Sequence, residues 1–306
     1  MASYKSFVKK ADSLYDAKKY EESATAYQKA FDAVGGGAYP YDRYNAACSF
    51  ALSGDTAKAL FHLFSLAKHS KIKYKNYNHI TTDPDLKSLY INKRWKKLIE
   101  LVKANKDEAE KDLDRPLVAI LDSIYIEDQK YRRELGEIEE KYGFSSKEVS
   151  NHWKLIEEKD SINLIKVKKI LDERGWLGPK VVGAQGNSTL FLVIQHSDLE
   201  TQLKYLPMMR DAVEKGNANA SSLALLEDRV ALRQGKRQIY GSQVRRDSET
   251  KEFFVLPLIE PEKVNERRAK VGLGSIEEYI QNWGMTWDVE RHKERTKKFE
   301  SEKEVR

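Results

Sequence analysis

An internal repeat of 36 residues constrains the first third of this 306-residue chain more than any other feature of its sequence. Three pairs of positions at this spacing carry small or large side chains in register: Ala11 with Ala47, Ser23 with Ala59, and Tyr27 with Leu63. In each copy, apolar residues recur at helical spacing on both sides of a short turn, which predicts a helical hairpin. A fixed period of this size is typical of stacked hairpins that bury their apolar faces against one another. The segment Gly35-Gly36-Gly37 is interpreted as a lengthened loop between the copies.

The small and aromatic residues of these hairpins resemble the tetratricopeptide repeat family over residues 4–68. The residues that carry the resemblance are Tyr20, Ala30, Asn45-Ala46-Ala47, Gly54-Asp55 and Ala59-Leu60. A degenerate third unit is expected from Asp83 to Val102. The resemblance implies a concave groove that binds a peptide or a partner protein. A clamp for a chaperone carboxylate is not expected, because Val8 and Asp12 stand where members with that clamp carry Lys and Asn. The alternative is that the repeats act only as a spacer.

The length of the chain favours two domains, because one hydrophobic core rarely serves more than about 250–300 residues. We predict a mainly α protein: tetratricopeptide-like helical hairpins at residues 1–110, then an α-rich α+β domain at 111–287. A charged tail is expected at 288–306. The second domain is predicted to contain long charged helices over residues 115–174 and one β-hairpin near 238–257. The apolar run 190–194 is either a buried helix or a core strand, and the helical segments on both sides of it favour the helix. The hairpin turn is expected at residues 246–250.

Motifs of the C-terminal domain resemble a widespread bacterial domain family of unknown function over residues 117–285. These motifs are Gln195-His196-x-Asp198, Leu226-Glu227-Asp228-Arg229-Val230, Gln238-x-Tyr240-Gly241-Ser242-Gln243, and the segment from Arg267 to Tyr279. The Gln-x-Tyr-Gly-Ser-Gln element is the most specific of them. The resemblance implies a shared fold and no established activity.

Seven polar residues of these motifs are candidates for a ligand site: His196, Asp198, Asp228, Arg229, Gln238, Tyr240 and Gln243. Histidine, carboxylate, guanidinium and amide groups together can position water or hold a polar ligand. The alternative is purely structural: Asp198 caps a helix, Asp228 pairs with Arg229, and the glutamines bond to the backbone of the hairpin. No catalytic residue is assigned. The spacing supplies no third metal ligand, so we expect no metal and no cofactor.

A second candidate feature is a basic segment without acidic residues between Val230 and Arg246. Its cations, which are candidates for anion binding, are Arg233, Lys236, Arg237, Arg245 and Arg246. On a hairpin they would form a positive patch for phosphates or an acidic partner. Nucleic acid is not expected as a partner, because Tyr240 is the only aromatic residue among these cations. The alternative is that acids near the segment in sequence, such as Glu227 and Glu252, neutralise it.

The remaining features concern the compartment and the function class. The only cysteine, Cys48, lies among small residues and is expected to be buried and structural. No apolar stretch approaches the ~20 residues of a membrane-spanning helix. The N-terminus has no apolar signal segment, so a cytoplasmic location is the default unless a leader has been removed.

Taken together, these features lead us to expect a protein- or peptide-binding repeat protein with a C-terminal module of unknown activity. The alternative is an enzyme or polar-ligand-binding domain that uses the His/Asp/Arg/Gln/Tyr cluster. The sequence leaves the oligomeric state open.

Overall fold

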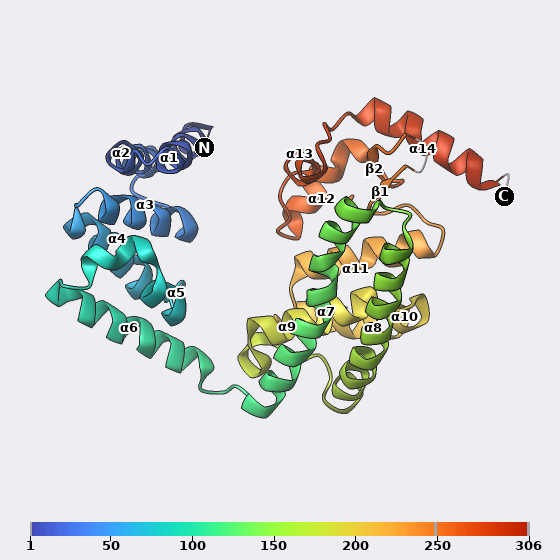
Figure 1. Cartoon of the computed structure of the whole chain (residues 1–306), viewed down its shortest axis with the longest axis horizontal. Helices are drawn as coiled ribbons and strands as arrows, with labels where there is room; N and C mark the ends of the chain where they lie inside the picture. Colours follow the sequence, from blue (N-terminus) through green and yellow to red (C-terminus); the bar gives the residue numbers. More distant parts are fainter. Residues whose placement is uncertain (1, 248–249, 305–306) are drawn as a thin grey trace. The chain divides into compact units, whose positions relative to one another are not determined.

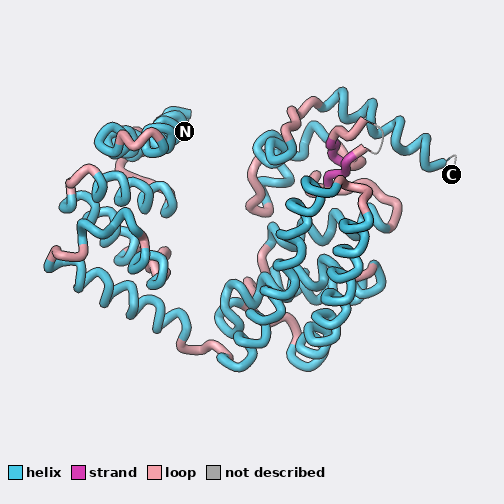
Figure 2. The backbone as a smooth tube through the Cα atoms, in the orientation of Figure 1, coloured by secondary structure: helices cyan, strands magenta, loops and turns pink. Residues whose placement is uncertain are grey.

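The computed structural model describes residues 2–247 and 250–304, and it divides the chain into two compact units (Figure 1). The first unit comprises residues Met1–Asp112 and the second comprises Leu113–Arg306. Both units are built almost entirely from helices, and two short strands occur in the second (Figure 2). The expected fold class, mainly α with helical hairpins followed by a helix-rich part with one small hairpin, is therefore confirmed.

Helical hairpins form the first unit, and small residues let their helices approach closely. Its elements are α1 (Ala2–Asp16), α2 (Tyr20–Asp32), α3 (Pro40–Leu52), α4 (Thr56–Lys68), α5 (Tyr77–Thr82), the 3-10 helix η1 (Pro84–Leu89) and α6 (Lys93–Glu110). The repeated alanines Ala11, Ala47 and Ala59 are fully buried. The Ser23 hydroxyl, in a position equivalent to Ala59, donates to the Ala11 carbonyl at 2.8 Å.

The third part of this unit departs from a regular hairpin at Asp83 and Pro84. Asp83 ends α5 and caps η1, where its carboxylate accepts the backbone N–H of Asp85. The hydroxyl of Tyr44 on α3 donates to the same carboxylate at 2.9 Å. Proline at the first position of η1 has no N–H to lose and restricts the preceding residue to extended backbone. The chain therefore breaks between α5 and η1 at these two residues.

Five helices form the core of the second unit. They are α7 (Arg115–Tyr142), α8 (Lys147–Arg174), α9 (Pro179–His196), α10 (Leu199–Glu214) and α11 (Ala220–Arg233). The long helices α7 and α8 lie side by side, and α9 packs against both (Figure 1). The predicted buried helix at residues 190–194 is part of α9, with Leu190 and Ile194 fully buried. Asp198, one of the seven residues predicted for a ligand site, caps α10 by accepting the Thr201 backbone N–H at 2.7 Å.

The rest of the second unit consists of a short β-hairpin and helices that pack around it. Strands β1 (Val244–Arg246) and β2 (Phe253–Val255) are antiparallel, with Val244 opposite Val255. The following elements are η2 (Pro261–Lys263), α12 (Val264–Lys270), α13 (Ile276–Ile280), η3 (Gln281–Trp283) and α14 (Val289–Glu304). The hairpin is thus shorter than the predicted 238–257. Of its expected turn, residues 248 and 249 lie outside the described part of the chain.

The segment expected to be a charged tail contains the helix α14, which packs on the hairpin. The Phe299 and Phe254 rings lie 6.0 Å apart, and Arg237 forms two hydrogen bonds with the Glu300 carboxylate. Apolar contact and ion pairing together hold α14, most of whose residues are charged, against the rest of the second unit. None of the helices in the described residues is long and apolar enough to cross a membrane.

Candidate functional site

The Asp228 carboxylate organises the loop that contains the Gln-x-Tyr-Gly-Ser-Gln motif. Its two oxygens accept the backbone N–H groups of Ile239, Tyr240 and Ser242 at 2.6, 2.9 and 2.9 Å. Asp228 is fully buried, and this burial raises its pKa although the three amides act in the opposite direction. Gly241 has a positive φ of 70°, which lets the chain turn around the carboxylate. Asp228 therefore holds the loop and does not pair with Arg229 as the structural alternative proposed.

Gln238 fixes the same loop from the other side. Its side-chain amide donates to the carbonyls of Gln243 and Leu256, and its Oε1 accepts the Gln243 N–H. This glutamine is completely buried with its amide group satisfied. Gln238 and Tyr240 precede β1, so the expectation that they stand on a hairpin strand is wrong. The loop is instead a separate turn, because backbone groups that would continue the ladder bond to the Asp228 and Gln238 side chains.

Two arginines on α11 bind the end of α9, where helix carbonyls have no partners within the helix. Arg229 donates from Nη1 to the Gln195 carbonyl at 2.8 Å, and Arg233 donates from Nη1 to the Ser197 carbonyl at 2.6 Å. Arg229 also donates from Nε to Oε1 of Gln243 at 3.2 Å. The motif around His196, the motif around Asp228 and the motif loop are thus joined through Arg229.

A cavity of about 260 Å³ lies where these parts meet the hairpin. It is lined by Arg229, Leu232, Arg233, Gln243, Arg245, Leu256 and Phe299. Three guanidinium groups face this space, and none of the described residues that line it is acidic. Burial and the nearby charge of Arg233 lower the pKa of Arg229 to about 10. The cavity is therefore a site of positive charge that lacks a carboxylate counter-charge of its own.

The other predicted cations are engaged elsewhere. Arg237 is paired with Glu300 at 2.7 Å, and Lys236 donates to the Gln234 side chain. Arg246, on the same strand as Arg245, donates to the Lys251 carbonyl and stacks over Phe253. The five cations thus do not form a single patch on the hairpin. Arg233 and Arg245 enter the cavity together with Arg229 and Gln243, which the sequence placed in a different candidate set.

His196 belongs to a different cluster. Its Nδ1 atom lies 2.9 Å from Oδ1 of Asp128 on α7, a buried carboxylate that the sequence analysis missed. Arg132 lies 3.5 Å from Asp128 and forms two hydrogen bonds with Asp160 on α8. Burial acts to raise the Asp128 pKa, but the hydrogen bond and charge of His196 and the charge of Arg132 leave it lowered. In the sequence, the only sign of this cluster is that Asp128 and Arg132 are four residues apart, the spacing at which two side chains can pair on one face of a helix.

This cluster borders a cavity of about 210 Å³ that also contains Glu157 and Asp198. Ligand atoms of Asp128, Asp160 and His196 lie within 4.8 Å of one another, as a metal ion would require. The Arg132 guanidinium already binds both carboxylates, however, and supplies the positive charge. A second group of this kind, Cys48 with Asp83 and Asp85, is also engaged, since Tyr44 and Tyr15 donate to its carboxylates.

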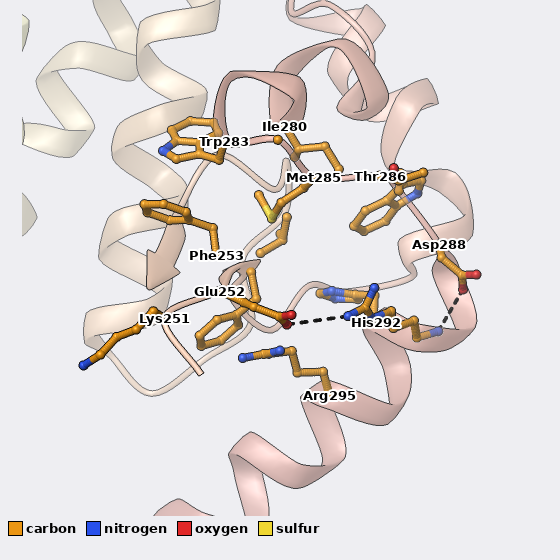
Figure 3. A pocket seen from close by; sticks show the side chains of 15 residues that line it. Lys251, Glu252, Phe253, Ile280, Trp283, Met285, Thr286, Asp288, His292 and Arg295 are labelled. Atoms are coloured by element: carbon orange, nitrogen blue, oxygen red, sulfur yellow. Dashed lines mark hydrogen bonds and ion pairs between the residues drawn. The ribbon is translucent and has the colours of Figure 1, made fainter. Parts of the chain in front are cut away.

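The most spacious of the cavities described in this unit, about 420 Å³, lies between β2, the loop after η3, and α14. Figure 3 shows Ile280, Trp283 and Met285 gathered at one end of it, and Lys251, Glu252 and Arg295 at the other. Its charges are largely paired: Arg295 lies 2.8 Å from Asp247, and Arg291 lies 3.6 Å from Glu252. It contains none of the residues predicted from the sequence.

Comparison with known proteins places the second unit in a family. Neither the curated proteins nor the solved structures contain a match to the chain. One family model does match, over residues 115–289, and its description is a family of unknown function (DUF6624). This span agrees with the resemblance seen at residues 117–285, and it supports a C-terminal domain of unknown function. By this match, which covers more than half of its length, the chain belongs to the DUF6624 family.

Proposed function

We propose that the second unit is a binding domain for a small anionic ligand, held by Arg229, Arg233 and Arg245. The observation that carries this proposal is the cavity with three guanidinium groups and no acidic lining residue. Arg229 is largely withdrawn from water, whereas Arg233 and Arg245 are exposed at the mouth of the cavity. Guanidinium groups match the oxygens of phosphate, sulfate and carboxylate. An anion would supply the missing partner.

The hydrogen bonds already present leave donors for such a ligand. Arg229 uses Nε and Nη1, and Arg233 uses Nη1. Arg245 makes no hydrogen bond within the described part of the chain, and its guanidinium carbon lies 5.9 Å from the centre of the Phe299 ring. Gln243 has its Oε1 bound by Arg229 and its amide directed to the Ser242 hydroxyl. The space of about 260 Å³ is below the ~300–1,000 Å³ of drug-sized sites, so it suits a small anion or a single charged group of a metabolite.

Two neighbouring arginines provide a matched test. Arg245→Gln removes a charge that lines the cavity, whereas Arg246→Gln removes the same charge from the next residue of β1. Binding of phosphate, sulfate and citrate to the full chain would be measured by calorimetry at constant ionic strength. We expect Arg245→Gln to weaken binding about tenfold, since a hydrogen bond to a charged group contributes about 1.5 kcal/mol or more. Arg246→Gln should stay within about twofold. Equal losses in both variants would mean a general charge effect and would refute the site.

We also propose that the first unit is a tetratricopeptide-type module that binds a protein or peptide. The 36-residue repeat and the two complete hairpins support this, as does Tyr41 at the start of α3, a residue that is 74% exposed. Exposed aromatic residues are typical of protein interfaces. The test compares the partners captured by the full chain and by Tyr41→Ser. Identical capture by both would contradict a role for this surface.

A further inference from the structure

The net positive charge of the protein is confined to its first unit. Residues 1–112 contain 20 Lys and Arg against 14 Asp and Glu, whereas residues 113–306 contain 34 of each. The excess of six is therefore absent from the unit that contains the arginine cavity. Within the first unit, the segment between Asp85 and Glu100 has five cations and no acid. These are Lys87, Lys93, Arg94, Lys96 and Lys97.

Lys87 lies in η1, and the other four cations lie at the start of α6. All five are exposed, and in the described part of the chain none of them is within ion-pair distance of a carboxylate. Four of them lie within the first five residues of α6, whose first turn has no acidic residue. Cations at this end oppose the helix dipole, which favours negative charge there. Residues that lower the stability of their own helix, as these cations do, are expected at functional sites.

An apolar tip accompanies the cations. Ile91 is 93% exposed, the highest value among the large hydrophobic residues that the structure describes, and Tyr90 beside it is 41% exposed. The Tyr90 ring stacks on Trp95 at 5.0 Å, and the Tyr90 hydroxyl donates to the Thr81 carbonyl. The Asn92 side chain caps α6 by accepting the Arg94 N–H. The turn is therefore held in place while Ile91 projects from it.

We propose that residues 87–97 form a docking surface for an anionic membrane. A bilayer interface is bound by three classes of residue, and all three are present here: a projecting aliphatic side chain, Tyr and Trp rings, and several exposed cations. The charge is complementary to acidic lipid headgroups, and each cation near such a surface contributes about fivefold to the binding constant. A soft lipid layer accepts Ile91 without a preformed pocket. Docking would be peripheral and reversible, and it goes beyond the ligand and partner binding proposed above.

The experiment uses the full chain and co-sedimentation with vesicles. One set is phosphatidylcholine alone, and in the other about a third of the lipid is phosphatidylglycerol. We expect binding to the anionic vesicles only, and a steep loss of binding as salt is raised. Lys96→Gln combined with Lys97→Gln should weaken binding more than tenfold, by the fivefold contribution of each charge. Ile91→Ser should weaken it several-fold at unchanged charge.

The matched control is Lys9→Gln combined with Lys10→Gln, two exposed lysines of α1. This variant loses the same charge and should stay within about twofold of the parent protein. Circular dichroism checks that every variant is folded. The proposal is overturned if the anionic vesicles are not bound, or if both lysine pairs have the same effect. It is also overturned if a polyanion such as polyglutamate or RNA, but no vesicle, is bound in an Ile91-dependent way.

Discussion

The imidazole Nδ1 of His196 lies 2.9 Å from the carboxylate of Asp128, a residue 68 positions earlier in the chain. This pair joins the end of α9 to the middle of α7, and Arg132 extends it to Asp160 on α8. Polar side chains from three helices thus bond to one another in a largely buried position. The arrangement explains why His196 is not part of the arginine cavity, although its neighbours Gln195 and Ser197 bond to the arginines of that cavity.

Replacing Asp128 by Asn should lower stability in a pH-dependent way. The folded-state pKa of Asp128 is lowered, so its carboxylate stabilises the fold above the unfolded pKa of about 3.9 and ceases to do so as pH falls through the folded value. At pH 7 we expect a loss of about 3 kcal/mol, because Arg132 and His196 lose a buried partner. Urea unfolding at several pH values would measure it. The difference between parent and variant should shrink as pH falls below the unfolded pKa, and a constant difference would contradict the ionic account.

Replacing Asp228 by Asn should destabilise the second unit by about 3 kcal/mol, because three backbone amides lose a charged acceptor in a buried site. The expected readout is a lower melting temperature of the second unit. Asp211→Asn is the control: Asp211 is exposed and forms an exposed ion pair with Lys215, four residues later, so its loss should cost less than about 1 kcal/mol. Similar losses in both variants would show that Asp228 does not organise the motif loop.

His62 should make the first unit sensitive to mild acid. Burial between aromatic rings, helped by the charges of Arg43 and Lys58, lowers its pKa to about 4. The unfolded chain then binds more protons between about pH 4 and 6.5, so stability rises with pH in that window, by about 2–3 kcal/mol. NMR titration of the imidazole measures the pKa, and urea unfolding of His62→Phe should show a flatter pH profile. The exposed His69, replaced by Gln, should leave the profile unchanged, and a normal His62 titration near pH 6.5 would refute the prediction.

Cys48 should resist alkylation in the folded protein. It is buried, and burial together with the charges of Asp83 and Asp85 raises the pKa of its thiol, whereas the thiolate is the reactive form. We expect iodoacetamide to react at least about 100-fold faster in urea than in buffer at pH 8. Mass spectrometry of the modified chain measures both rates. Rapid labelling of the folded protein would show that the thiol is accessible.

The sequence by itself determined the elements whose signals are local. The 36-residue repeat predicted the paired hairpins, since small residues recur wherever two helices cross. The capping box that begins α13 is of this local kind, because both hydrogen bonds between Ser275 and Glu278 lie within four residues. The apolar run at residues 190–194 could be assigned to a helix from its helical neighbours, and the C-terminal motifs gave the family span.

Only the tertiary structure decided which polar residues meet. Asp228 and Gln238 are in the predicted set, but whether a carboxylate holds a ligand or its own backbone depends on how the loop turns at Gly241. His196 and Asp128, and likewise Arg229 and Arg245, are brought together by helix packing and not by spacing along the chain. Side-chain burial and the choice among several possible partners arise from the assembled core. For this reason the residue types of the candidate site could be read from the sequence, whereas the fold decided which of them face the same cavity.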